Sequence, residues 1–167
     1  MSKRIVFALS SKYPTEKAYG VTVGRTALAL RGMGNEVEIY SPKTSGLAMD
    51  VFGNKLRVYP KGVLTRIFLK CADKSRGLNV IWQSFFGLKV GRRHRDQSVF
   101  LCFRDTYSVL VSILCNRQSM HILELHHYPN GVKRKILRFL DSRKNFRLVY
   151  ISEDMKERCE KLIGLNS

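Results

Sequence analysis

The sequence is short of acidic residues. It has 13 aspartates and glutamates against 30 lysines and arginines, which gives a formal net charge of +17. This imbalance predicts a polyanionic partner, such as an anionic membrane, a nucleic acid or a phosphate-bearing ligand. No run of about 18 apolar residues occurs, so we expect no transmembrane helix. The first apolar stretch is too short for a signal peptide. We therefore expect a cytoplasmic protein, peripheral on the inner face of the cell membrane.

Cysteines are few, and no two of them form a CxxC pair. The four cysteines stand far apart in apolar runs, at Cys71, Cys102, Cys115 and Cys159. This spacing favours reduced thiols in a cytosolic core over disulfides or a zinc site. We expect no bound metal.

Several catalytic and nucleotide-binding signatures are also missing. The loop after the first apolar run has no GxGxxG, and neither a GxxxxGK[ST] phosphate loop nor a GxSxG nucleophile motif occurs. No carboxylate pair has spacing that suggests a glycosidase. These absences argue against a third function, that of a small nucleotide-dependent enzyme that is complete in itself.

The sequence does contain an alternation of short apolar runs and helical patterns. Six runs of strand length are rich in β-branched residues. They are Arg4 to Leu9, Glu36 to Tyr40, Lys55 to Tyr59, Ser98 to Phe103, His121 to Leu125 and Arg147 to Ile151. Apolar residues at helical spacing lie between and after them. These helical patterns are centred on residues 23–30, 64–71, 78–85, 109–114, 132–140 and 155–163.

This alternation predicts an α/β fold. Strands that alternate with helices form βαβ units and a mainly parallel sheet. We expect about six strands with helices on both faces, a doubly wound, Rossmann-like arrangement. With 167 residues and no internal linker, the chain is expected to be one such domain over residues 1–167.

In such sheets ligands bind beyond the carboxyl ends of the strands, and this rule selects three segments. The first is the long loop 10–20, in which Gly20 is expected to precede a helix whose free N–H groups favour an anion or a sugar hydroxyl. The alternative is an ordinary surface loop. The loop's candidate binding residues are Lys12, Tyr13, Tyr19 and Gly20.

The other two segments follow later strands. Arg104 could meet a phosphate or carboxylate, or could form an ion pair at the sheet edge, and Asp105 is suited to cap the next helix. Strand alternation places Glu124 and His126 on the same side, where the histidine could move a proton near neutral pH. His126 is the catalytic candidate, and the binding candidates in these two segments are Arg104, Asp105, Glu124 and His127, although His127 fits a loop position better.

Residues 61–95 combine basic and aromatic side chains. Nine basic residues stand against one acid, interleaved with Trp82, Phe85 and Phe86. Basic amphipathic helices of this kind are typical of membrane-interface segments. The alternative is that the apolar faces pack on the sheet while the charges are solvated. The candidate membrane-surface residues are Arg66, Lys70, Lys74, Lys89, Arg92 and Arg93.

Nucleic acid or an anionic protein could use the same charge, so a basic Rossmann-like binding module is the alternative function. No recognisable RNA- or DNA-reading motif occurs, and the aromatic residues stand at core-like helical spacings. We therefore expect no specific nucleic-acid partner.

Four segments in order resemble the N-terminal domain of the retaining glycosyltransferases of family 4, which have the GT-B fold. They are RIVFALSSKYPTEKAYGVTVGRTALALRGMGNEVEIYSP, FRDTYS, LELHH and RLVYISEDMKER. The opening matches at Pro14, Gly20, Leu28, Leu30, Gly34, Glu36, Val37 and Pro42. It departs at Tyr19, where the family has a glycine, and at Asn35, where it has a histidine.

The resemblance implies transfer of a sugar from a nucleotide-sugar donor to a lipid-linked or glycan acceptor, with retention and without a required metal. His126 matches the histidine that contacts the donor sugar, Gly20 lies in the segment near the donor phosphates, and Lys12, Tyr13 and Arg104 would line the acceptor side. The family's second, nucleotide-sugar-binding domain has no counterpart in the chain. The resemblance therefore implies an acceptor-binding half that needs a C-terminal domain or subunit, with little turnover alone.

Overall fold

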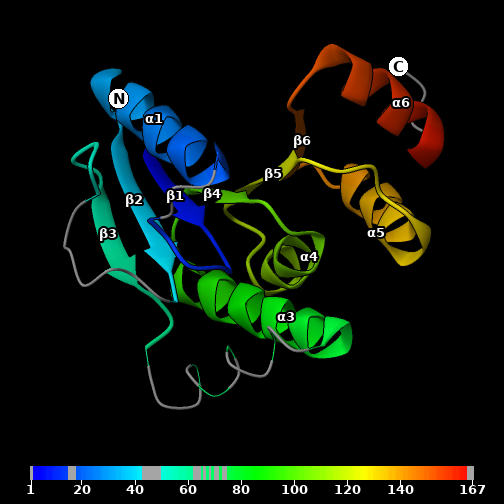
Figure 1. Ribbon diagram of the computed structural model, residues 1–167, viewed down its shortest axis with the longest axis horizontal. Coiled ribbons are helices and arrows are strands. Elements are labelled where there is room, and N and C mark those ends of the chain that lie inside the picture. Colours follow the sequence, from blue (N-terminus) through cyan, green and yellow to red (C-terminus); the bar gives the residue numbers. More distant parts are fainter. Residues whose placement is uncertain are drawn as a thin grey trace.

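The computed structural model contains a six-stranded, all-parallel sheet (Figure 1). It describes residues 2–14, 18–42, 50–61, 65, 67, 69, 72 and 75–164, and of Tyr19 only the backbone. The strands are β1 (Arg4–Ala8), β2 (Glu36–Ser41), β3 (Lys55–Val58), β4 (Phe100–Phe103), β5 (Met120–Leu125) and β6 (Phe146–Tyr150). Their order in the sheet is β3-β2-β1-β4-β5-β6. The strands β2 and β3 are thus added on one side of β1, and β4, β5 and β6 are added on its other side. The strand order therefore reverses between β1 and β4.

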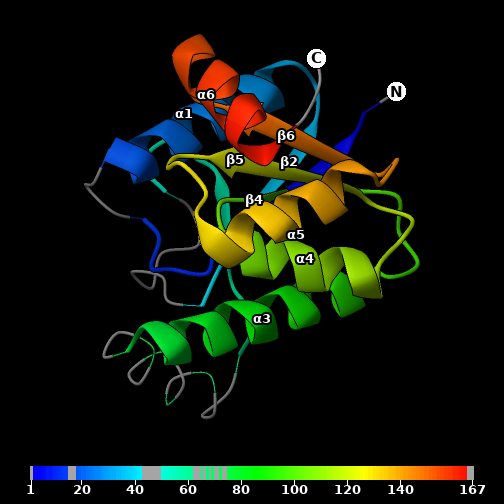
Figure 2. The same cartoon turned by 90° about the vertical axis from the view of Figure 1, so that its right-hand side faces the viewer.

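Five helices are described, and they cover both faces of the sheet. They are α1 (Ala18–Gly32), α3 (Arg76–Arg93), α4 (Thr106–Cys115), α5 (Gly131–Asp141) and α6 (Glu153–Ile163). Helix α1 lies on one side, and α3, α4 and α5 lie on the other (Figures 1 and 2). The predicted doubly wound, Rossmann-like α/β fold is confirmed. The helix expected near residues 64–71 lies mostly outside the described residues.

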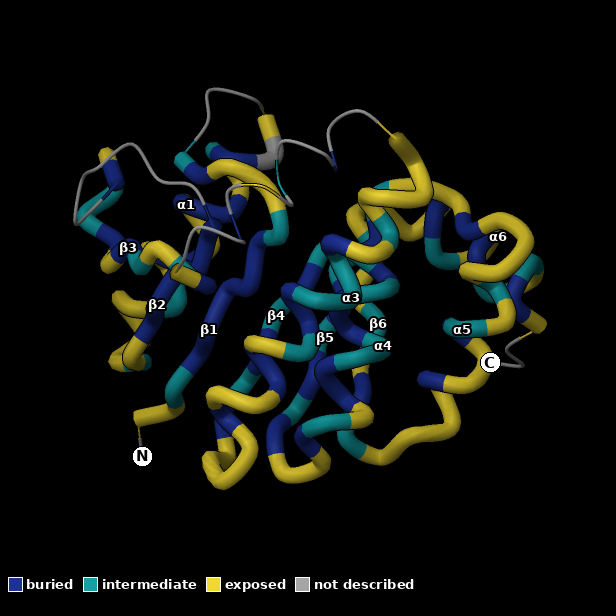
Figure 3. Tube along the Cα trace, turned by 90° about the horizontal axis from the view of Figure 1, so that it is seen from below, coloured by how far each residue is buried: buried dark blue, intermediate teal, exposed yellow. Residues whose placement is uncertain are grey.

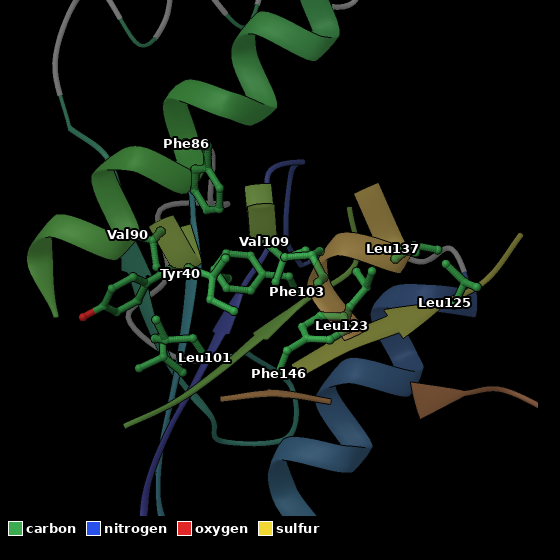
Figure 4. Close-up of a cluster of buried hydrophobic side chains, with 14 of the residues drawn as sticks. Tyr40, Phe86, Val90, Leu101, Phe103, Val109, Leu123, Leu125, Leu137 and Phe146 are labelled. Atoms are coloured by element: carbon green, nitrogen blue, oxygen red, sulfur yellow. The ribbon is translucent and has the colours of Figure 1, made fainter. Parts of the chain in front are cut away.

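Alternating strand residues build two separate cores. On the α1 side, Ile5, Phe7 and Ile39 pack against Val23 and Ala27 of the helix. On the opposite face the larger cluster joins the sheet to the other helices (Figure 4). Its labelled members are Tyr40, Phe86, Val90, Leu101, Phe103, Val109, Leu123, Leu125, Leu137 and Phe146. Figure 3 shows that β1 and β2 are buried along most of their length.

Helix ends follow the predicted capping residues. The Ser152 hydroxyl accepts a hydrogen bond from the Met155 N–H at 3.2 Å and begins α6, as expected for an N-cap. Helix α1 ends at Gly32, and Gly34 follows in the left-handed region with φ of 84°. Among the described residues, no helix is both long and apolar enough to cross a membrane.

Helices α3 and α4 cross at unusually short distance because two glycines face two serines. A Cβ atom on Gly87 would lie 2.1 Å from the backbone oxygen of Ser108, and one on Gly91 would lie 2.8 Å from that of Ser112. The Ser108 hydroxyl also donates to the backbone oxygen of Gln83 at 2.8 Å. Only glycine permits this approach of the two backbones.

Candidate functional site

The carboxyl ends of β1, β4 and β5 lie next to one another in the sheet. The strand order reverses at β1 and β4, and this is the place where open parallel sheets bind ligands. Side chains at these three ends are linked by hydrogen bonds. Ser10, after β1, hydrogen-bonds through its side chain to Asp105, after β4. The three ends therefore form one continuous polar region.

Its central feature is a carboxylate that holds an arginine and a histidine. Glu124, near the end of β5, accepts two hydrogen bonds from Arg104, at 2.8 Å from Nε and 2.9 Å from Nη2. His126 Nε2 lies 3.2 Å from Oε1 of the same carboxylate. The side chains are 14–26% exposed, so the cluster is half-buried rather than solvated.

The placement confirms that Glu124 and His126 share one side of the strand. It also shows that the ion pair considered as the alternative for Arg104 exists, with Glu124 as its partner. The bidentate geometry fixes the plane of the guanidinium. Arg104 thus fixes the orientation of the Glu124 carboxylate beside His126.

The electrostatics of the site favour a neutral His126. Burial lowers the pKa of the imidazole, and the guanidinium of Arg104 lowers it further, while Glu124 acts in the opposite direction. The Nε2 atom is buried beside the Glu124 carboxylate, 3.2 Å from Oε1. A neutral imidazole held in this way can accept or donate a proton on contact with a ligand hydroxyl.

Asp105 has the predicted capping role. Its carboxylate accepts a hydrogen bond from the Ser108 N–H at 2.9 Å and begins α4. Burial raises the pKa of this carboxyl, and its hydrogen bonds with Ser108 and Ser10 oppose that rise. Its side chain links the ends of β1 and β4 through the hydrogen bond with Ser10.

The first loop differs from the expectation in two respects. Tyr13 is only 1% exposed, and its hydroxyl donates to Asp50 at 2.6 Å, so its phenol does not line a surface site. Gly20 does not precede the first helix, because α1 already begins at Ala18; the glycine is buried in the first turn. Lys12 is exposed, as a binding residue should be, and the side chain of Tyr19 lies outside the described residues.

Two side chains that hold the first loop through hydrogen bonds could not be predicted from the sequence. Asp50 was not singled out, yet it is buried and accepts the Tyr13 hydroxyl. Trp82, assigned to an apolar helix face, donates its indole N–H to the backbone oxygen of Ser10 at 2.8 Å. A tryptophan beside an otherwise apolar stripe is a signal for such a bond, since a buried indole N–H needs an acceptor. His127 is exposed in the loop after β5.

Where it is described, the basic middle of the chain has the buried apolar face and the exposed charges of the core alternative. Trp82 and Phe86 on α3 are buried against the sheet, as the core alternative requires. Lys89, Arg92 and Arg93 lie exposed on the same helix. Arg66, Lys70 and Lys74 lie outside the described residues. Helix α3 therefore has an apolar inner face and a basic outer edge.

Comparison with known proteins adds no identification. No family model matches the chain, and no curated protein matches it in sequence. Among the described residues, no group of three or more histidine, cysteine or acidic side chains could hold a metal ion, and Cys102, Cys115 and Cys159 are free thiols.

Proposed function

We propose that the chain is the acceptor-binding half of a retaining glycosyltransferase with the GT-B fold. It acts together with a domain or subunit that binds the nucleotide-sugar donor. The observation that supports this most strongly is the Arg104–Glu124–His126 cluster at the strand ends beside the reversal point. Each of these residues falls in a segment that resembles the family, and the sheet joins the two segments.

In this proposal the residues orient and stabilise; none forms a covalent bond with the sugar. The bond between the anomeric carbon and the donor phosphate breaks, the acceptor oxygen bonds to that carbon on the same face, and the acceptor proton passes to the leaving phosphate. His126, neutral and half-buried, contacts a hydroxyl of the transferred sugar. Arg104 and Glu124 hold that imidazole in place, which is the type of preorganisation that lowers a barrier with charge development.

The test uses the chain alone and the chain combined with a candidate nucleotide-sugar-binding domain, sought in the reading frame after Ser167. A panel of UDP-, GDP- and ADP-linked hexoses is supplied with lipid-linked and glycan acceptors, and release of the nucleoside diphosphate is measured. We expect turnover only from the combination. Full activity of the chain alone would refute the requirement for a second half.

A pair of variants tests the site within the active combination. His126→Ala is expected to lower the transfer rate by about 100-fold, the size of effect seen when one preorganised donor is removed. His127→Ala, which changes the exposed neighbour, is expected to lower it far less. Equal losses in the two variants would remove His126 from the proposed role.

We also propose that the basic outer edge of α3 holds the protein on an anionic membrane surface. Lys89 and Arg92 are exposed there, and Leu78 and Ile81 on the same helix are 38% and 52% exposed. Exposed apolar residues beside basic ones are the composition of an interfacial helix. Sedimentation with phosphatidylglycerol and with phosphatidylcholine vesicles tests this proposal. Equal binding to both lipids would refute the electrostatic part, and tighter binding to oligonucleotides would favour the alternative module.

A further inference from the structure

A second cluster of charges lies at the opposite end of the sheet, and the proposed transfer reaction does not use it. Glu38 on β2 is fully buried, and three cations surround its carboxylate. Arg57 Nη2 lies at 2.7 Å, Arg4 Nη2 at 3.4 Å and Lys55 Nζ at 3.6 Å. Arg4 and Lys55 are the first residues of their strands, so the cluster lies at the amino ends of β1 and β3.

A fourth cation joins the cluster from α3. Arg93 donates from Nε to the Tyr40 hydroxyl at 3.1 Å, and that hydroxyl donates to Glu38 at 3.2 Å. The guanidinium of Arg93 also lies over the rings of Tyr40 and Tyr59, 5.8 Å and 5.3 Å from their centroids. In Figure 4 the Tyr40 oxygen points away from the buried hydrophobic cluster.

The cluster has an excess of positive charge. Within the part of the chain that the structure describes, the ion pairs of Arg4, Lys55 and Arg57 all go to Glu38. Burial alone would raise the pKa of Glu38, but Arg57 and Arg4 outweigh burial and hold that pKa below its usual value. One ionised carboxylate therefore faces four cations.

The cations are also partly accessible and not fully hydrogen-bonded. The side chains of Arg4 and Arg57 are 31% and 40% exposed, and Arg93 is exposed. Buried Nε–H groups on Arg4 and Arg57 have no hydrogen-bond partner. Arg4 is further held by Gln97, which accepts from Nη1 at 3.2 Å. The guanidiniums are thus fixed on their inner side. The buried Nε–H groups are out of reach of a ligand, but the exposed part of each guanidinium keeps further N–H donors.

From this geometry we infer a binding site for a phosphate monoester at Arg4, Arg57 and Arg93. Guanidinium forks match phosphate oxygens, and a dianionic phosphate offsets two of the excess charges. Nucleic acid fits less well, because Tyr40 is fully buried and the Arg93 guanidinium lies over the Tyr59 ring, so neither ring is well placed to stack on bases. This inference does not depend on the proposed sugar transfer, and its test uses no donor or acceptor.

Glu38 has a specific role in this inference: it is a positioning residue. If binding depended on charge alone, Glu38→Gln would tighten it, because a negative charge disappears from the cluster. If binding depends on guanidiniums held in fixed orientation, the same substitution weakens it. The two explanations therefore predict opposite signs for one variant.

The experiment is an NMR titration of the whole chain with inorganic phosphate, at ionic strength held constant with chloride. We expect saturable shifts at Tyr40, Arg57 and Arg93. Arg93→Lys keeps the charge but loses the fork, and we expect it to weaken binding about tenfold, the value of one charge-assisted hydrogen bond. Glu38→Gln should also weaken binding. Arg25→Gln, an exposed control on α1 across the sheet, should leave it unchanged.

Three results would overturn the inference: unsaturable shifts, a Glu38→Gln variant that binds more tightly, or an Arg93→Lys variant that behaves like the Arg25→Gln control. Melting temperatures establish that each variant is folded. If Glu38→Gln does not fold, Arg93→Lys still tests the inference, because Arg93 is at an exposed position.

The source of the phosphate is distinguished with vesicles. Phosphatidylcholine is mixed either with phosphatidic acid, a phosphate monoester, or with phosphatidylglycerol, a diester, at matched surface charge. Preference for phosphatidic acid that is lost in Arg93→Lys indicates a lipid headgroup. Binding of inorganic phosphate without that preference indicates a soluble phosphate ester.

Discussion

Gly87→Ala tests the close crossing of α3 and α4. The new Cβ would lie 2.1 Å from the Ser108 oxygen and 2.7 Å from its Cα, and these are backbone atoms that cannot rotate away. Overpacking of this kind costs about 1–3 kcal/mol, and the upper end applies because the helices must separate. Alanine returns about 1 kcal/mol through its higher helix propensity. We expect a net loss of about 2 kcal/mol in the free energy of unfolding.

The same helix supplies a graded comparison. At Gly91 the nearest atom to a new Cβ is the Ser112 oxygen at 2.8 Å, so Gly91→Ala should cost less, about 1 kcal/mol. At Gly77 the nearest atom is a serine hydroxyl at 3.9 Å, so Gly77→Ala should be neutral or stabilising by about 0.5 kcal/mol.

Urea unfolding followed by circular dichroism measures all three variants, and unchanged m-values allow the midpoints to be compared. We expect Gly77→Ala to be the most stable of the three variants, Gly91→Ala to be less stable, and Gly87→Ala to be the least stable. If Gly87→Ala unfolds at the same urea concentration as Gly77→Ala, the two helices do not approach as closely as described, and the reasoning fails.

Further predictions concern buried polar groups. Tyr13→Phe removes the 2.6 Å hydrogen bond to buried Asp50 and should cost about 1–2 kcal/mol in urea unfolding; an unchanged midpoint would contradict this bond. Burial lowers the pKa of His121 to about 4. Between about pH 6.5 and pH 4 this histidine is therefore protonated in the unfolded chain but neutral in the folded chain. Stability should therefore fall with pH across this window, and less so in His121→Gln, as pH-dependent urea midpoints would show. Arg104→Gln should raise the pKa of His126, because a cation beside it is lost; an NMR titration of the imidazole that gives no rise would exclude this coupling.

The fold could be predicted from the sequence because each strand is specified by its own run of residues. β-Branched apolar runs such as Arg4 to Leu9 stand between helical patterns, and the observed strand β1 ends one residue earlier than expected. The serine before α6 and the aspartate before α4 act as caps, as their positions indicated. These features depend on neighbours a few residues away, which a sequence displays directly.

Features that depend on distant partners were not predictable in the same way. Glu38 stands in a run of alternating character, and its complete burial depends on arginines supplied by β1 and β3. Tyr13 stands in a polar loop, yet it is buried because Asp50 accepts its hydroxyl. The pairing of Glu124 with His126 could be expected from strand alternation, whereas the bidentate bond from Arg104 required the register between β4 and β5.

The contact between α3 and α4 has a mechanical consequence. Helix α4 begins immediately after Arg104 and Asp105, and its serines are pressed against the glycines of α3 without intervening side chains. The direct backbone contact and the hydrogen bond from Ser108 to the Gln83 backbone oxygen therefore couple the two helices closely. A molecule bound at the outer edge of α3 would therefore keep a defined orientation relative to the cluster that contains His126.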